Sequence, residues 1–298
     1  IVVSVPGSFR MAYLRGKKKF GSNSWAGLIG SGAKLLLSVL FVLAGWGVSG
    51  AIAGLVLAQL VSFLYSGRKA RQAGFGPSLR GSFWRLPDFR LIMPELKYAG
   101  LVLAASLSIT ALYSIDIIAV KHYFDAETAG LYAGIATVAR IIFFVTASIP
   151  QVLLPSVRLG DAPGKSRRTL QYSALLLVGI GGAVLAVFWL LPELVVRLLM
   201  GGSYTEFAYL LPRLGLVIFV VSVLNLVLQY YLALRRYPVG FIAIIGLAVT
   251  CGLVVANHSS PQAIVDSMLY GSLVSLGVLA VWAGVTGNNS KGEIQHAT

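Results

Sequence analysis

The chain has 298 residues, of which 57% are hydrophobic and 11% are charged, and its 24 lysines and arginines against 10 acidic residues give a net charge of +14. A soluble domain carries about 25% charged residues, so this composition excludes an ordinary globular protein and predicts a polytopic membrane protein. The basic residues lie in alternate loops and not along one helical face, which argues against nucleic acid as a partner.

Eight apolar runs are long enough to cross a bilayer, which takes about 20 residues of helix. These runs are Ser24–Ala44, Val48–Ser66, Tyr98–Val120, Gly130–Leu154, Thr169–Leu191, Phe207–Leu234, Val239–Ala256 and Ala263–Val285. The chain begins at Ile1 without a methionine or a signal peptide, so we read it as a fragment of a longer protein. The expected fold is all-α, with eight transmembrane helices.

The first two spans are separated only by Gly45–Gly47, which predicts a very tight turn. Gly50 and Gly54 follow four residues apart, a small-xxx-small spacing that lets helix backbones approach closely. We expect this spacing to serve helix packing.

Lysines and arginines are distributed unevenly between the loops of the two sides. The side that holds the N-terminal segment carries 19 of the 24, and the opposite loops carry only Lys121 and Arg197. Because cytoplasmic loops are enriched in Lys and Arg, we expect both ends of the chain in the cytoplasm.

Residues 67–97 form the longest polar stretch between two spans, with seven cations and interleaved aromatic and aliphatic residues. This mixture suits a cytoplasmic segment in the headgroup region, with its cations on anionic lipid. A solvated linker between two bundles is an equally open interpretation. Residues 286–298 form a short polar tail.

Four charged residues within the spans are the candidates for function: Lys34, Asp116, Arg140 and Arg213. A charge at membrane depth usually faces a bundle interior or a water-filled path. Lys34 and Arg140 lie near mid-membrane, where we expect them to face a cavity. Asp116 and Arg213 lie at similar depths below the outer surface, which predicts a structural bridge between them; a coupling or gating role for Asp116 is the alternative.

Three amides within the spans are further candidates: Asn225 and Gln229 on adjacent turns of one helix, and Gln151 beside Pro150. Such side chains line a cavity or make hydrogen bonds between helices. The histidines His122, His258 and His296 fall in outer loops and in the tail, and the one cysteine, Cys251, lies in an apolar run. No catalytic set, metal site or cofactor site is therefore predicted, and the chain is not expected to be an enzyme.

Three motifs resemble the polysaccharide (oligosaccharide-lipid) flippases of the multidrug/oligosaccharidyl-lipid/polysaccharide exporter superfamily. The first is Tyr113-Ser-Ile-Asp116 at the end of a span, followed by Phe124-Asp-Ala-Glu-Thr-Ala-Gly130-Leu-Tyr132-Ala133. The second is Leu198-Leu-Met-Gly201-Gly-Ser-Tyr204-Thr-Glu-Phe-Ala208, and the third is Gly45-Trp-Gly-Val-Ser-Gly50-Ala-Ile. The three motifs occur in the same order and at similar spacing as in the family, and the resemblance extends over nearly the whole chain.

The resemblance implies a protein of twelve to fourteen helices in two six-helix lobes, of which this chain holds the C-terminal two-thirds. Residues 1–66 are then the end of the N-terminal lobe, residues 67–97 the cytoplasmic linker and residues 98–285 the C-terminal six-helix lobe. The implied function is to flip undecaprenyl-type lipid-linked oligosaccharides for surface polysaccharide synthesis, beside other polysaccharide-assembly proteins of the membrane.

The implied substrate carries a pyrophosphate, so its path needs cations. Lys34, Arg140 and Arg213 are the residues that fit this need. One departure concerns Asp116, because many members of the family follow this aspartate with arginine and Ile117 stands there in this chain. A role that requires an adjacent Asp-Arg pair is not expected.

Three other functions remain open from the sequence. A cation-coupled multidrug exporter of the same superfamily would use acidic residues within its spans, whereas the candidates within these spans are three cations and one acidic residue. A membrane glycosyltransferase or polymerase would need larger loops with acidic or histidine residues. A truncated, inactive product is the third alternative.

Overall fold

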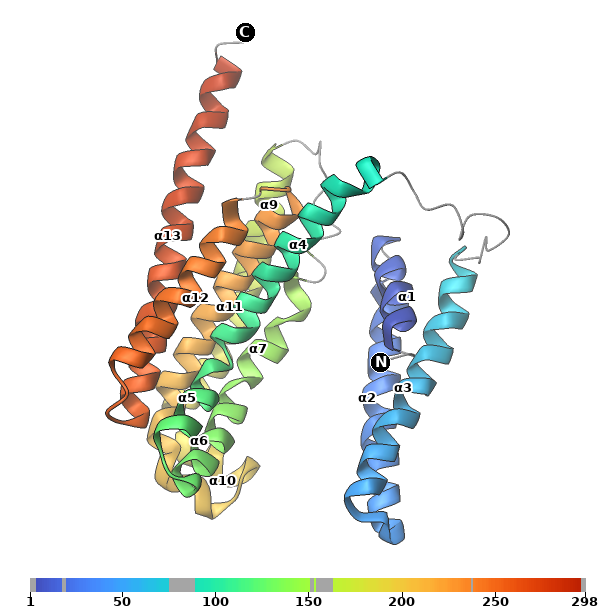
Figure 1. Ribbon diagram of the computed structural model, residues 1–298, viewed down its shortest axis with the longest axis vertical. Helices are drawn as coiled ribbons and strands as arrows, with labels where there is room; N and C mark the ends of the chain where they lie inside the picture. The colour runs from blue at the N-terminus through green and yellow to red at the C-terminus, as the bar shows by residue number, and fades with distance from the viewer. Residues whose placement is uncertain are drawn as a thin grey trace. The chain divides into compact units, whose positions relative to one another are not determined.

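The computed structural model describes residues 4–17, 20–74, 89–150, 153, 163–236 and 238–295, and no strand occurs in these ranges. The elements form two compact units, Ile1–Asp88 and Phe89–Thr298 (Figure 1). The all-α fold predicted from composition is confirmed.

The first unit consists of α1 (Ser4–Gly16) and a helical hairpin of α2 (Phe20–Phe41) and α3 (Gly47–Gln72). A π-helical turn, η1 (Val42–Trp46), joins the two arms, with Gly45 at φ 87° and Gly47 at φ 53°. Glycine adopts these left-handed angles without the steric penalty of a Cβ atom. The predicted tight turn is therefore confirmed.

The two arms of the hairpin run antiparallel and lie close together. Ser38 of α2 donates a hydrogen bond from Oγ to the carbonyl oxygen of Ala51, 3.2 Å away in α3. At Gly54, a Cβ atom would lie 2.5 Å from the backbone nitrogen of Ser38. The small residues expected to serve helix packing thus allow the backbones of α2 and α3 to touch.

The second unit is a bundle whose elements follow in this order: α4 (Phe89–Leu112), α5 (Ile115–Tyr123), α6 (Ala126–Ala139), α7 (Ile141–Thr146), α9 (Pro163–Leu190), α10 (Pro192–Leu199), η2 (Gly202–Leu210), α11 (Leu211–Ala233), α12 (Pro238–Ala256) and α13 (Pro261–Gln295). The central helix is α11, which packs against α4, α6, α7, α9, α12 and α13. Its Leu214, Ile218 and Leu224 are buried among apolar side chains of those neighbours.

The connections of the second unit lie alternately at its two ends. Figure 1 shows the α5–α6 connection, α10 and the α12–α13 connection at one end, and the starts of α4 and α9 at the other. This alternation is what a chain that crosses a membrane repeatedly requires.

Six helical stretches are long and apolar enough to cross a membrane, and the bent pair α4–α5 adds a seventh. The first stretch, Ser24–Gln72, has 49 residues, about 73 Å of helix, more than twice the ~30 Å of a hydrocarbon core. It is the α2–α3 hairpin, so it supplies two crossings. The eight crossings predicted from the sequence are therefore present.

One span differs from its prediction. Tyr98–Val120 was expected as one helix, but α4 ends at Leu112 and α5 begins at Ile115, with a bend of 48° between them. Ser114 breaks the helix, with φ −124° and ψ −15°. The residues after the break, including Asp116, consequently point in a new direction.

Candidate functional site

The bend between α4 and α5 holds a buried ion pair. Asp116 lies in the first turn of α5 and its side chain is 1% exposed, while Arg140 lies between α6 and α7 and is 12% exposed. Arg140 Nη2 is 2.9 Å from Asp116 Oδ1. An acidic side chain in the first turn also interacts favourably with the helix N-terminus. The pair therefore joins two consecutive spans.

Two further hydrogen bonds complete this site. The hydroxyl of Tyr132, which is fully buried on α6, donates to Asp116 Oδ2 at 3.2 Å. Arg140 Nε donates to the carbonyl oxygen of Tyr113 at 3.0 Å. Tyr113 follows the last residue of α4, where carbonyl groups lack partners within the helix. Arg140 thus bonds to both sides of the break, to the end of α4 and the start of α5.

The predicted bridge between Asp116 and Arg213 is wrong, because Asp116 pairs with Arg140. The prediction compared depths along straight helices, whereas the bend at Ser114 carries Asp116 against α6. From the sequence, Arg140 was a candidate for the substrate path. The structure places its guanidinium group in the buried ion pair with Asp116. Each of the two charges neutralises the other, which makes both tolerable at this depth.

Arg213 has a different partner, Asp266 of α13. Both carboxylate oxygens of Asp266 lie 2.9 Å from Arg213 Nη1. The Asp266 side chain is 30% exposed and the Arg213 side chain is 47% exposed. The sequence candidates omitted Asp266. Asp266 lies inside the predicted span Ala263–Val285. Its position in that span could therefore have identified it from the sequence as a charged residue within the membrane.

The remaining candidates are not brought together with this pair. Lys34 is exposed on α2 in the first unit, and no described residue forms an ion pair with it. Asn225 and Gln229 are partly buried on α11, and neither forms a hydrogen bond to another helix in the described ranges. Gln151 lies outside the described residues.

The second motif noted in the sequence packs on α6, directly after the end of the first motif at Ala133. Gly134 of α6 lies against the ring of Tyr204 in η2, and a Cβ atom on Gly134 would be 2.5 Å from Tyr204 Cε1. Gly201 precedes η2 with φ 96°, an angle that favours glycine. The second motif therefore positions Tyr204 on α6, the helix that carries Tyr132 and ends immediately before Arg140.

Comparison with known proteins supports the same classification. A family model described as "Polysaccharide biosynthesis protein" matches residues 1–209. A search of the curated proteins gives no match.

Several solved structures share the fold. The chain is similar to the outward-facing conformation of a multidrug resistance MATE family transporter of the MOP superfamily, with TM-score 0.74 and 16% identity over 97% of this chain and 68% of that one. It is also similar to MATE in complex with MaL6 (TM-score 0.73, 15% identity, 97% and 69% covered). A third similar structure is MATE in the bent conformation (TM-score 0.69, 18% identity, 99% and 69% covered).

The family match covers more than half of the chain, and the structural matches cover nearly all of it. The resemblance inferred from the three motifs is confirmed at the level of the superfamily. The chain belongs to the polysaccharide biosynthesis protein family and is a multi-pass membrane protein with the fold of MATE transporters.

Proposed function

We propose that the protein is a flippase that moves undecaprenyl-type lipid-linked oligosaccharides across the bacterial inner membrane for surface polysaccharide assembly. The observation that carries the proposal is the match of residues 1–209 to a polysaccharide biosynthesis family in a chain with an exporter fold. Exporters with two lobes move a substrate by rocking one lobe against the other around a central site.

The charges of the first unit support an anionic substrate. Residues 1–87 contain no Asp or Glu, so Lys34 has no carboxylate in the described part of its own unit. A cation of this kind at membrane depth attracts a pyrophosphate while the lipid tails stay in the bilayer. In this proposal Lys34 contributes to the substrate path directly.

The Asp116–Arg140 pair has a different role in the proposal. Both charges are already neutralised, and the pair bonds to both sides of a broken span. Broken helices are a recurring feature of transporter sites. We assign Asp116 and Arg140 to positioning the bend, and we keep Arg213, Asn225 and Gln229 as residues whose effect on the path is to be measured.

A multidrug exporter is the second candidate function, and the MATE transporters of similar fold favour it. Such a pump needs a free carboxylate within a span to bind a coupling cation or a cationic drug. Asp116 and Asp266, the two span aspartates in the described ranges, are both paired with arginine. This arrangement favours the lipid-linked, anionic substrate.

The surroundings of the protein follow from the same proposal. Its ends lie in the cytoplasm, as the loop charges indicate, and the cations of residues 67–97 favour contact with anionic lipid. Residues 75–88 of this stretch lie outside the described part of the chain. Other polysaccharide-assembly proteins of the membrane supply the substrate and use the product.

A transport assay tests the proposal. The full-length protein is reconstituted in vesicles, and the movement of a fluorescent undecaprenyl diphosphate oligosaccharide between leaflets is measured. We expect Lys34→Gln to slow the movement about tenfold, the effect of losing one charge-assisted contact of about 1.4 kcal/mol. Lys121→Gln, which removes one exposed cation from the last turn of α5, is the matched control and should retain the wild-type rate.

The outcomes separate the two candidate functions. Export of a cationic dye without movement of the labelled lipid would assign the protein to multidrug export. Movement of the lipid at the wild-type rate in Lys34→Gln would remove Lys34 from the path and leave the transport activity itself established.

A further inference from the structure

The two units differ in how their cations are neutralised. In the second unit, both arginines within spans pair with aspartates. Among residues 1–88, which make up the first unit, Asp88 is the single acidic residue, and residues 1–87 contain only cations among their charged side chains. The cations of the described part of the first unit therefore have no carboxylate partner within that part and are available to anions from outside it.

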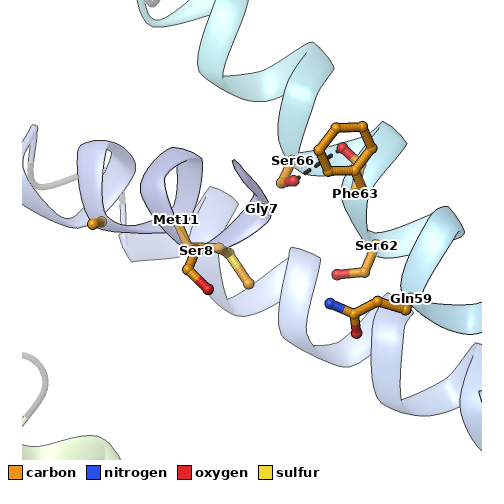
Figure 2. Close-up of a pocket in the computed structure, with 8 residues that line it drawn as sticks. Gly7, Ser8, Met11, Gln59, Ser62, Phe63 and Ser66 are labelled. Carbon is orange, nitrogen blue, oxygen red and sulfur yellow. Dashed lines mark hydrogen bonds between the residues drawn. The ribbon is translucent and has the colours of Figure 1, made fainter. Parts of the chain in front are cut away.

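A pocket of about 340 Å³ lies between α1 and α3 in this unit. It is lined by Gly7, Ser8, Met11, Ala12, Gln59, Ser62, Phe63 and Ser66. Figure 2 shows Ser8 and Met11 of α1 facing Gln59 and Ser62 of α3 across the pocket. Hydroxyl and amide groups thus line a hollow in a hairpin whose other faces are largely apolar.

Arg10 of α1 contacts Phe63, one of the residues that line this pocket. Its Nη1 donates to the carbonyl oxygen of Phe63 at 3.2 Å, and its Cζ lies 4.0 Å from the centroid of the Phe63 ring. A Cβ atom on Gly67 would be 2.6 Å from Nη1, so glycine at this position makes room for the guanidinium. Arginine has five N–H donors, and this contact uses one of them.

The pocket lies in the C-terminal half of α3, where basic residues and tyrosines are close together. Lys69 Nζ is 6.0 Å from the centroid of the Tyr65 ring, and Lys17 Nζ is 5.8 Å from that of Tyr13. The Tyr13 hydroxyl donates to the carbonyl oxygen of Ala73 at 3.3 Å. Tyrosines and cations in this combination mark the headgroup level of a membrane.

We propose that the pocket between α1 and α3 binds the phosphate group of an anionic membrane lipid. Arg10, in contact with Phe63 of the pocket wall, offers charge-assisted hydrogen bonds to the phosphate. Gln59 and Ser62 line the part of the pocket that receives the rest of the headgroup, and Lys69 adds positive charge about one helical turn after Ser66 on α3. The same phosphate chemistry occurs in anionic phospholipids and in polyprenyl diphosphates. Binding is measured without transport, so the proposal is independent of the proposed function.

Native mass spectrometry of the full-length protein tests the site, with cardiolipin, phosphatidylglycerol, phosphatidylethanolamine and undecaprenyl diphosphate as separate probes. We expect cardiolipin and phosphatidylglycerol to bind more tightly than zwitterionic phosphatidylethanolamine. Arg10→Gln should weaken their binding about tenfold, the loss of one charge-assisted interaction. Arg71→Gln is the matched control, because it removes one exposed cation from the same end of α3, and it should change binding less than about twofold.

A second variant tests the pocket without changing the charge. Ala12 lines the pocket and is exposed, so Ala12→Leu should fill the space, weaken lipid binding and leave the melting temperature of the protein unchanged. Tighter binding of undecaprenyl diphosphate than of cardiolipin would support the phosphate site and identify a polyprenyl diphosphate as the lipid that it prefers. Equal losses in Arg10→Gln and Arg71→Gln, or wild-type binding by folded Ala12→Leu, would overturn the proposal.

Discussion

Arg140 Nη2 lies 2.9 Å from Asp116 Oδ1 across the bend between α4 and α5. The carboxylate of Asp116 has a donor at each oxygen, because Tyr132 bonds to the second one. Arg140 also bonds to the Tyr113 carbonyl on the other side of the break. The direction in which the span continues after its break therefore depends on one arginine of the next span.

Neutralising either partner of this pair is predicted to destabilise the protein strongly. Asp116→Asn leaves Arg140 as a lone buried cation, and Arg140→Gln leaves Asp116 as a lone buried anion. Breaking a buried pair in this way costs about 3–5 kcal/mol. The expected result is a lower melting temperature of the purified protein and less protein in the membrane for each single variant.

The double variant Asp116→Asn/Arg140→Gln removes both charges and should recover much of the lost stability. Lys121→Gln is the control, since it removes one exposed cation from the last turn of α5 and exposed charges contribute less than about 1 kcal/mol. Strictly additive losses in the double variant would contradict the structural role of the pair. They would leave Asp116 as a candidate for coupling.

Gly134→Ala is predicted to disturb the packing of α6 on η2. The new Cβ atom would lie 2.5 Å from Tyr204 Cε1, so the ring has to move, and we expect a lower melting temperature. Gly130→Ala is the control on the same helix, because nothing lies within 4 Å of its Cβ position. That substitution should stabilise the helix by up to about 1 kcal/mol. A stabilising Gly134→Ala would show that this contact is absent.

The helices of this protein could be predicted from the sequence because hydrophobic length determines a membrane span. Each of the eight apolar runs corresponds to a helix or a bent pair of helices. The turn at Gly45–Gly47 was also predictable, since only glycine tolerates φ 87° without strain. The bend at Ser114 was not predicted, because serine occurs within many membrane helices and no proline marks the break.

The partners of the charges within spans could not be predicted from depth alone. Depth matched Asp116 with Arg213, but pairing also depends on the rotation of each helix and on the bend, which brings Asp116 to Arg140. Arg213 instead meets Asp266, which the list of candidates lacked. The pocket beside Arg10 depends on how α1 lies on α3, a contact between segments about 50 residues apart that no local pattern indicates.

The start of α6 provides a pH-dependent prediction. Asp125 caps this helix by accepting a hydrogen bond from the Thr128 backbone N–H at 2.9 Å, which holds the pKa of Asp125 below its usual value. A carboxyl group whose pKa is lower in the folded state than in the unfolded state stabilises the fold. This stabilisation is complete at pH values above the unfolded-state pKa of about 3.9, and it is lost as the pH falls through the folded-state pKa.

The melting temperature of Asp125→Ala should therefore lie below that of the wild type by a constant amount between about pH 8 and pH 5, well above that pKa. The difference should shrink only at more acidic pH. Asp125→Asn is the control, because asparagine is an equally good capping residue, and it should behave as the wild type does at neutral pH. A difference that grows on acidification would contradict the sign.

Orientation is predicted by the loop charges and can be measured by labelling of single cysteines in a Cys251→Ala background. Ser203 and Ser259 are exposed at the end of the second unit that carries Lys121, and Arg168 is exposed near the start of α9. Cysteines at 203 and 259 should react with an impermeant thiol reagent in intact cells. A cysteine at 168 should react only after the cells are opened, and the reverse pattern would invert the topology.

The close contact of α2 with α3 gives the last prediction. A Cβ atom on Gly54 would lie 2.5 Å from the nitrogen and 2.7 Å from the Cα of Ser38. These are backbone atoms, so no side chain can turn aside, and Gly54→Ala has to push the two arms of the hairpin apart. Gly32→Ala, on α2 with nothing within 4 Å of its Cβ position, is the matched control.

We expect Gly54→Ala to lower the melting temperature and to expose the Ser38 side chain, which now bonds to the Ala51 carbonyl inside the hairpin. Both effects can be measured on the purified protein, the second by the labelling rate of a cysteine placed at position 38 in each background. Gly32→Ala should leave that rate unchanged and raise the melting temperature, since alanine favours a helix over glycine by up to about 1 kcal/mol. If the two alanine variants behave alike, the arms do not touch at Gly54, and the glycine serves another purpose than close packing.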